Sequence, residues 1–102
     1  MDIKEDRFRH IRFERSHLPQ KKYNAIIEDK VTRRQQKVPF GSRIHEQYHD
    51  STGLKLYSRL DHNDPKRRAN YLARHAKTMT KKFSSSWYAA VFLWSWNGKN
   101  TI

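Results

Sequence analysis

The longest apolar run of this 102-residue chain is the segment Trp87–Trp94. Hydrophobic residues make up only 35% of the sequence, below the usual share of about 45–50%, so few other segments can fill a core. Aromatic residues reach 13%, and a disordered chain lacks them. Because the run is apolar on every side, we expect it to be the buried centre of one small domain or an interface. It is too short to cross a bilayer, which takes about 20 residues.

Alternation and turn signals predict an α+β fold, with a β-hairpin packed on two or three helices and a Trp-rich helix at the C-terminus. Residues 21–40 form the predicted hairpin, because Tyr23, Ala25 and Ile27 alternate with more polar neighbours and give one apolar face. Pro39 places the returning strand at a sheet edge or near the strand's own end.

Capping residues predict the main helices. Asn63 or Asp64 is a good N-cap, and Pro65 suits the first position of a helix that runs to about Lys77. The serines of residues 84–86 can cap the closing apolar helix. The face of the first helix expected to be buried carries Pro65, Ala69, Leu72 and Ala76.

The chain is predicted to divide into three parts. Residues 1–20 are a basic and aromatic arm without a clear period, either a strand or a segment that orders on a partner. Residues 21–96 form the compact α+β domain, and residues 97–102 form a tail that, with Trp96, is the best candidate for an exposed contact. No apolar stretch suggests a secretory signal at the N-terminus, so secretion is not expected. The chain has no cysteine, which excludes disulfides and Cys-ligated metals.

Positive charge is the largest functional signal. The formal net charge is +12, from 22 Lys and Arg against 10 Asp and Glu, and no carboxylate side chain follows Asp64. This charge predicts binding to the phosphate backbone of nucleic acid, DNA in preference to RNA, without strong sequence readout. Acidic protein surfaces and mere solubility are the alternatives. The expected binding residues are Arg67, Arg68, Arg74, Lys77, Lys81 and Lys82, with a second contact from Arg33 and Arg34 beside Lys21, Lys22 and Lys37.

Residues 45–49 match the zinc-binding pattern H-E-x-x-H, in which two His on one helix face bind the metal. Ser42 can cap a short helix through about Asp50, which makes His45 and His49 weak candidate ligands of a zinc site. The glycines at 41 and 53 confine that helix to about two turns, and a third ligand from His62, Asp50 or Asp61 has no recognised spacing. We therefore expect no cofactor. No Gly-rich phosphate loop or nucleophile elbow is present in the sequence, and we expect a non-enzymatic protein.

Asp61, His62 and Asp64 are expected to form an architectural corner before the helix. The two carboxylates are placed to cap the helix and to pair with Arg67 or Arg68 one turn on, while His62 fixes the loop.

Six segments carry a resemblance to a known family: Lys22–Tyr23, Val38–Gly41, Tyr48–Thr52, Leu60–Arg68, Tyr71–His75 and Trp87–Trp94. On these residues the stretch from Lys21 to Trp94 resembles small basic proteins of undefined activity encoded by large double-stranded DNA viruses, including algal and amoebal giant viruses. The resemblance implies a viral origin and a place in the virion or in the host cytoplasm or nucleus, and it gives no reaction. It adds a second possible function, a minor capsid or other structural component that contacts larger virion proteins through its arm and tail.

Overall fold

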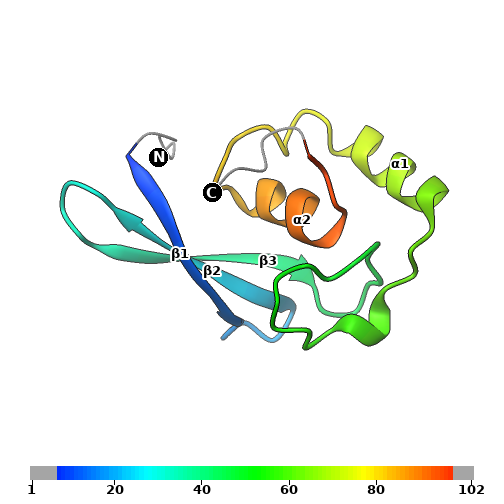
Figure 1. Cartoon of the computed structure of the whole chain (residues 1–102), viewed down its shortest axis with the longest axis horizontal. Helices are drawn as coiled ribbons and strands as arrows, with labels where there is room; N and C mark the ends of the chain where they lie inside the picture. Colours follow the sequence, from blue (N-terminus) through cyan, green and yellow to red (C-terminus); the bar gives the residue numbers. More distant parts are fainter. Residues whose placement is uncertain (1–6, 98–102) are drawn as a thin grey trace.

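The computed structural model describes residues 7–97. Its strands form one antiparallel sheet in the order β1-β2-β3, and helix α2 lies across one face of that sheet (Figure 1). The predicted α+β class is confirmed. In chain order the elements are β1 (Phe8–Arg15), β2 (Lys21–Asp29), β3 (Gln35–Ser42), the 3-10 helix η1 (Ser58–Leu60), α1 (Pro65–Arg74) and α2 (Ser85–Leu93).

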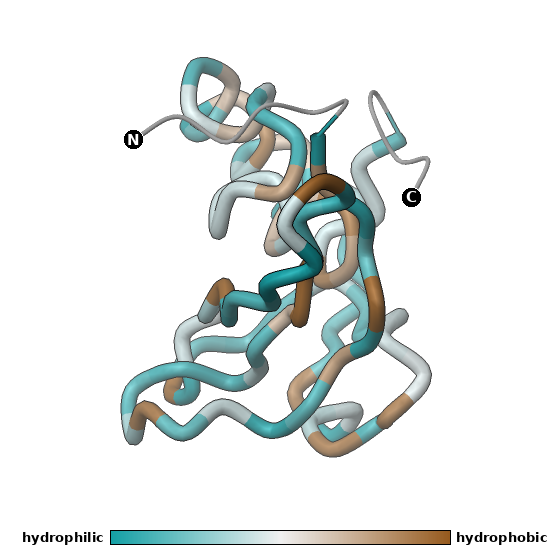
Figure 2. The backbone as a smooth tube through the Cα atoms, turned by 90° about the vertical axis from the view of Figure 1, so that its left-hand side faces the viewer, coloured by the Kyte–Doolittle hydropathy of each residue, from teal (hydrophilic) through white to brown (hydrophobic). Residues whose placement is uncertain are grey.

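The core lies between α2 and the sheet. Trp87 and Tyr88 of α2 are fully buried, and they pack with aromatic and aliphatic side chains of β2 and β3. The predicted Trp-rich C-terminal helix is therefore present and central. Ser84 caps it, because its hydroxyl accepts a hydrogen bond from the Trp87 backbone N–H. Hydrophobic stretches are short and separated by hydrophilic ones along the backbone (Figure 2), so this helix supplies much of what the chain can bury.

Strand β1 settles the conformation of residues 8–15, for which the sequence allowed a strand or a docking arm. It pairs along its length with β2, and its register shifts between His10 and Arg12. Such a β-bulge adds one residue and reverses the alternation of side chains, so His10 and Phe13 both face α2 and contact Tyr88. This explains why the sequence shows no period of two there. Residues 1–6 of the predicted arm and 98–102 of the predicted tail lie outside the described residues, and Trp96 is half-buried against the core.

The central strand β2 is buried on both faces, which differs from the single apolar face predicted. Tyr23, Ala25 and Ile27 face α2, but Asn24 on the opposite face is also fully buried. Side chains from the β1 side cover it: the Asn24 amide donates to Glu14 at 3.0 Å, and the Ser16 hydroxyl donates to Asn24 Oδ1 at 2.9 Å. Hydrogen bonding therefore allows polar residues to occupy this central strand.

The short helix predicted from Ser42 to Asp50 is not formed. Residues 43–57 are turns, bends and a parallel bridge between Gln47 and Asp61. The Gln47 backbone N–H donates to Leu60 O at 3.1 Å, and the His62 N–H donates to Gln47 O at 2.9 Å. The backbone of this segment is thus satisfied by residues far along the chain instead of by a helical turn.

Helix α1 begins where the sequence predicted, but the face that it turns toward the rest of the protein is not the predicted one. Asp64 caps it by accepting from the backbone N–H groups of Lys66 and Arg67. The helix ends at Arg74, three residues before the predicted end. The predicted inner face is wrong, because Pro65, Ala69 and Ala76 are exposed. The half-buried residues are Arg68, Tyr71, Leu72 and His75.

Candidate functional site: a basic groove

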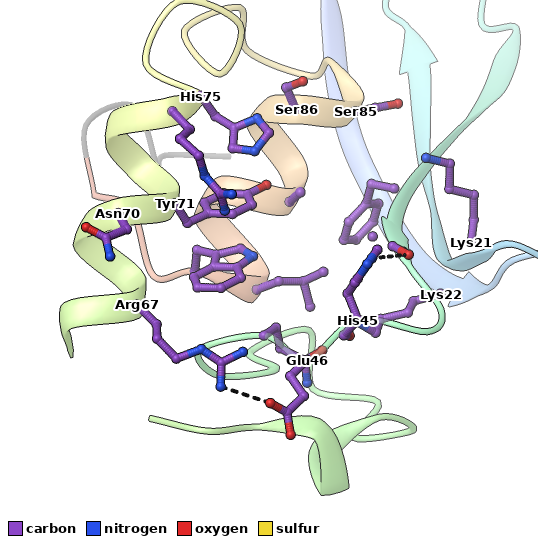
Figure 3. Close-up of a pocket in the computed structure, with 18 of the residues that line it drawn as sticks. Lys21, Lys22, His45, Glu46, Arg67, Asn70, Tyr71, His75, Ser85 and Ser86 are labelled. Carbon is purple, nitrogen blue, oxygen red and sulfur yellow. Dashed lines mark hydrogen bonds and ion pairs between the residues drawn. The ribbon is translucent and has the colours of Figure 1, made fainter. Parts of the chain in front are cut away.

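A groove of about 1140 Å³ lies between the end of β3, helix α1 and the start of α2 (Figure 3). Among the described residues that line it, Lys21, Lys22, Arg67 and Arg74 are cationic, and Glu46 is the one carboxylate. Its polar uncharged lining includes the side chains of Asn70, Ser42, Ser85 and Ser86. The groove, which is hereafter the basic groove, therefore offers positive charge and hydrogen-bond donors from β2, α1 and α2 together.

The two arginines of α1 that line the groove differ in their surroundings. The Arg67 guanidinium donates to Glu46 Oε1 at 2.9 Å in an exposed ion pair. Arg74 lies about two turns further along, at the end of the helix, and is exposed. The predicted pairing of Arg67 with Asp61 or Asp64 is wrong, because Glu46 from the 43–57 loop takes that position.

Arg68 was predicted to bind phosphate, but its side chain is engaged inside the fold. Nε donates to Trp94 O at 2.9 Å and Nη2 donates to Ser95 O at 2.8 Å. The guanidinium also lies 5.7 Å from the centre of the Tyr48 ring. These contacts fasten α1 to the chain that follows α2, which is a structural role.

A stack of rings forms the wall of the groove beside α1. Tyr71 contacts His75 (Figure 3), with ring centroids 4.2 Å apart. It also stacks on the indole of Trp94, at 4.1 Å. The Tyr71 and Trp94 planes are within 3° of parallel. His62 packs against Trp94 at 5.2 Å. The aromatic side chains of this wall therefore contact one another.

Lys22 is a buried lysine at the base of the groove, with 1% of its surface exposed. Its ammonium donates to His45 O at 2.6 Å. Burial lowers the pKa of Lys22 to about 8, while the nearby carboxylates of Asp50 and Asp61 act in the opposite direction. Lys22 thus holds the loop against β2 and contributes a positive charge under the groove at neutral pH.

The predicted corner residues hold the loop and the start of α1 through hydrogen bonds. Asp61 Oδ1 accepts from the Gln47 amide at 2.6 Å and from the Asp50 backbone N–H at 2.8 Å. His62 Nδ1 accepts from the Asp64 N–H at 2.9 Å, and Asp64 caps α1. The corner fixes where α1 starts and so where its arginines point.

The H-E-x-x-H match does not have the geometry of a zinc motif. His45 lies in a bend and His49 in irregular backbone, so they do not share a helix face. His45 Nδ1 is 2.8 Å from the Ser42 hydroxyl, and His49 Nδ1 is 3.3 Å from Asp61 Oδ2. Within residues 7–97 no three His, Asp or Glu side chains are grouped to hold a metal ion.

The remaining predicted cations lie outside the groove. Lys77 and Lys81 are exposed on the turns after α1, and the Lys82 ammonium lies 5.1 Å from the centre of the Phe83 ring. Arg33 and Arg34 are exposed at the β2–β3 turn, which lies at the opposite end of the molecule from α1 (Figure 1). The structure therefore brings together Lys21, Arg67 and Arg74, and it separates them from the hairpin turn.

The groove itself and several residues that line it were not predicted from the sequence. Asn70, His75 and Ser86 had no assigned role beyond the helices, because nothing in their local sequence indicates that α1 lies opposite β3. The cationic character of Arg67, Arg74, Lys21 and Lys22 was visible in advance.

Comparison of the chain with protein families, with curated proteins and with solved structures gave no match. In the part of the chain that the structure describes, no helix has the length and hydropathy that crossing a membrane requires.

Proposed function

We propose that this protein binds the phosphate backbone of nucleic acid and does not read its sequence. The observation that carries the proposal is the basic groove, a concave surface whose described lining includes Lys21, Arg67 and Arg74, with the buried charge of Lys22 beneath them and one carboxylate, Glu46. Lys and Arg give phosphates charge-assisted hydrogen bonds, and each neutralised phosphate releases counterions. The net charge of +12 adds long-range attraction to any polyanion.

Weak sequence readout follows from how α1 is placed. A helix that reads bases presents polar side chains from one face to a groove of the duplex. On α1, Arg68 and Tyr71 are already engaged with Trp94. The exposed polar side chains that remain on α1 are those of Lys66, Arg67, Asn70 and Arg74. Three of these four are cationic and suit phosphates.

Charge reversal of Arg74 tests the proposal, with Arg34 as the matched control. Both arginines are exposed, and Arg74→Glu and Arg34→Glu change the net charge equally at opposite ends of the molecule. Binding to a labelled DNA duplex of about 20 base pairs is measured over a salt series around 0.15 M. We expect Arg74→Glu to weaken binding about tenfold and to lower the log–log salt slope by about 1–2, and Arg34→Glu to do much less.

Equal losses in the two variants would contradict the proposal, because they would show that only the total charge matters. Circular dichroism of both variants checks that the fold is retained. Arg74→Gln, which removes the charge without placing a carboxylate at the end of α1, repeats the test without an unfavourable interaction with the helix dipole.

A further inference from the structure

We infer that the basic groove takes the backbone of double-stranded nucleic acid in preference to a single strand. This inference rests on the proposed function and names the substrate of the same site. It depends on two features of the groove. Its aromatic rings are packed against other side chains, and its remaining binding groups are positive charges and hydrogen-bond donors.

The rings that line the groove are already packed. Proteins that bind single strands usually stack the bases on exposed aromatic faces, which contributes about 1–3 kcal/mol per base. Here Tyr71 is enclosed between His75 and Trp94, and Phe40 is 1% exposed. Trp94 has Tyr71 on one side and contacts His62 as well. A single strand entering the groove would find little surface on which to stack its bases.

Two tyrosine rings outside the groove lining, Tyr48 and Tyr57, are also in contact with the protein's own cations. The Arg68 guanidinium lies 5.7 Å from the Tyr48 ring centre, and Arg59 lies 5.5 Å from that of Tyr57. The protein thus uses cation–π contacts internally. These rings, like those of the groove wall, serve the fold.

Charge and hydrogen-bond donors are what the groove does offer. A duplex carries one negative charge per about 1.7 Å of its axis, and one strand of it carries one per about 3.4 Å. A site that works through Lys21, Arg67 and Arg74 therefore gains more from a duplex. A duplex also keeps its bases paired, so it needs no stacking surface from the protein.

The test compares a labelled duplex of about 20 base pairs with each of its separated strands, at a salt concentration of about 0.15 M. We expect the duplex to bind at least about fivefold more tightly than either strand, and Arg74→Glu to reduce this preference while the control Arg34→Glu retains it. Tryptophan emission is the second measurement. Stacked bases quench indole fluorescence. We therefore expect either single strand to quench the tryptophan emission no more than the duplex does.

Two results would overturn the inference, and they differ in what they mean. Tighter binding of a single strand, with quenching of tryptophan emission, would show that rings open for stacking, and the proposed function would stand. Binding of neither form at this salt concentration would overturn the proposed function together with the inference.

Discussion

The Tyr23 hydroxyl donates a hydrogen bond to Asp50 Oδ2 at 2.5 Å and so joins the central strand to a loop 27 residues further along the chain. The same hydroxyl accepts from the Leu56 backbone N–H at 3.0 Å. Burial, together with the hydrogen bond to Asp50, raises the pKa of Tyr23 to about 12, so the hydroxyl keeps its proton at neutral pH. Buried side chains therefore organise the 43–57 loop in place of a helix.

Removing this hydroxyl should destabilise the protein. Tyr23→Phe leaves the Leu56 N–H without its acceptor and leaves Asp50 Oδ2 with only a long bond, 3.4 Å from the Tyr57 backbone N. We expect this to cost about 1–3 kcal/mol. Urea denaturation measures the free energy of unfolding. Tyr57→Phe is the matched control, because Tyr57 is also buried but its hydroxyl accepts one long bond, 3.4 Å from Arg15 Nη1. Equal losses in the two variants would count against a special role for the Tyr23–Asp50 contact.

The helix starts were predictable from the sequence because capping is a local interaction. Asp64 and Ser84 each accept a backbone N–H from within the next three residues, so neither cap depends on the rest of the fold. The apolar run after Ser84 was long enough to identify the buried helix. The hairpin was also visible, since β2 and β3 are joined by a short turn.

The parts that the sequence did not predict depend on distant partners. The loop with Gln47 and Asp50 contains residues that suit a short helix, but their hydrogen bonds go to Leu60, Asp61 and Tyr23. Helix α1 turns Arg68 inward because the Trp94 and Ser95 carbonyls accept its donors, which a count of apolar residues cannot show. The groove depends on both of these arrangements.

Arg68 and its neighbour Arg67 should separate stability from binding. Arg68→Ala removes two hydrogen bonds to backbone carbonyls that hold α1, so we expect a loss of about 1–3 kcal/mol in the free energy of unfolding. Arg67→Ala removes an exposed ion pair with Glu46 and should change stability little. The effect on duplex DNA binding should be the opposite. Under conditions where both variants are folded, we expect Arg67→Ala to bind the duplex more weakly than Arg68→Ala. Thermal unfolding and duplex titration measure the two effects, and a larger binding loss in Arg68→Ala would contradict this assignment.

Acidification should weaken the corner at His62. Its Nδ1 accepts the Asp64 N–H, so the neutral ring carries its proton on Nε2, and a proton on Nδ1 would break that bond. Burial, and then Arg67, lower the pKa of His62 against the opposing carboxylates of Asp64, Glu46 and Asp61. The unfolded chain therefore gains a proton first, and stability is lost as the pH falls below about 6.5.

His62→Asn tests this pH dependence, because asparagine offers an acceptor for the same N–H and does not titrate. The difference in the free energy of unfolding between about pH 7 and pH 5 should be smaller in the variant than in the native protein. Burial also lowers the pKa of His10. The variant His10→Asn therefore measures how much of the loss of stability at low pH comes from His10. An unchanged difference in His62→Asn would exclude His62 as a source of acid sensitivity.

Two glycines with positive φ provide the last prediction. Gly41 has φ +78° and Gly53 has φ +88°, so alanine at either position is strained by about 1–2 kcal/mol. The two positions differ in the room available for a Cβ atom. A Cβ on Gly41 would lie 2.7 Å from Leu93 Cδ1, whereas a Cβ on Gly53 would have no neighbouring atom within 4 Å. Because Leu93 is buried in α2 and cannot move freely, Gly41→Ala should cost a further 1–3 kcal/mol or so. Chemical denaturation of both variants measures the difference, and equal losses would show that α2 can shift away from β3 without cost.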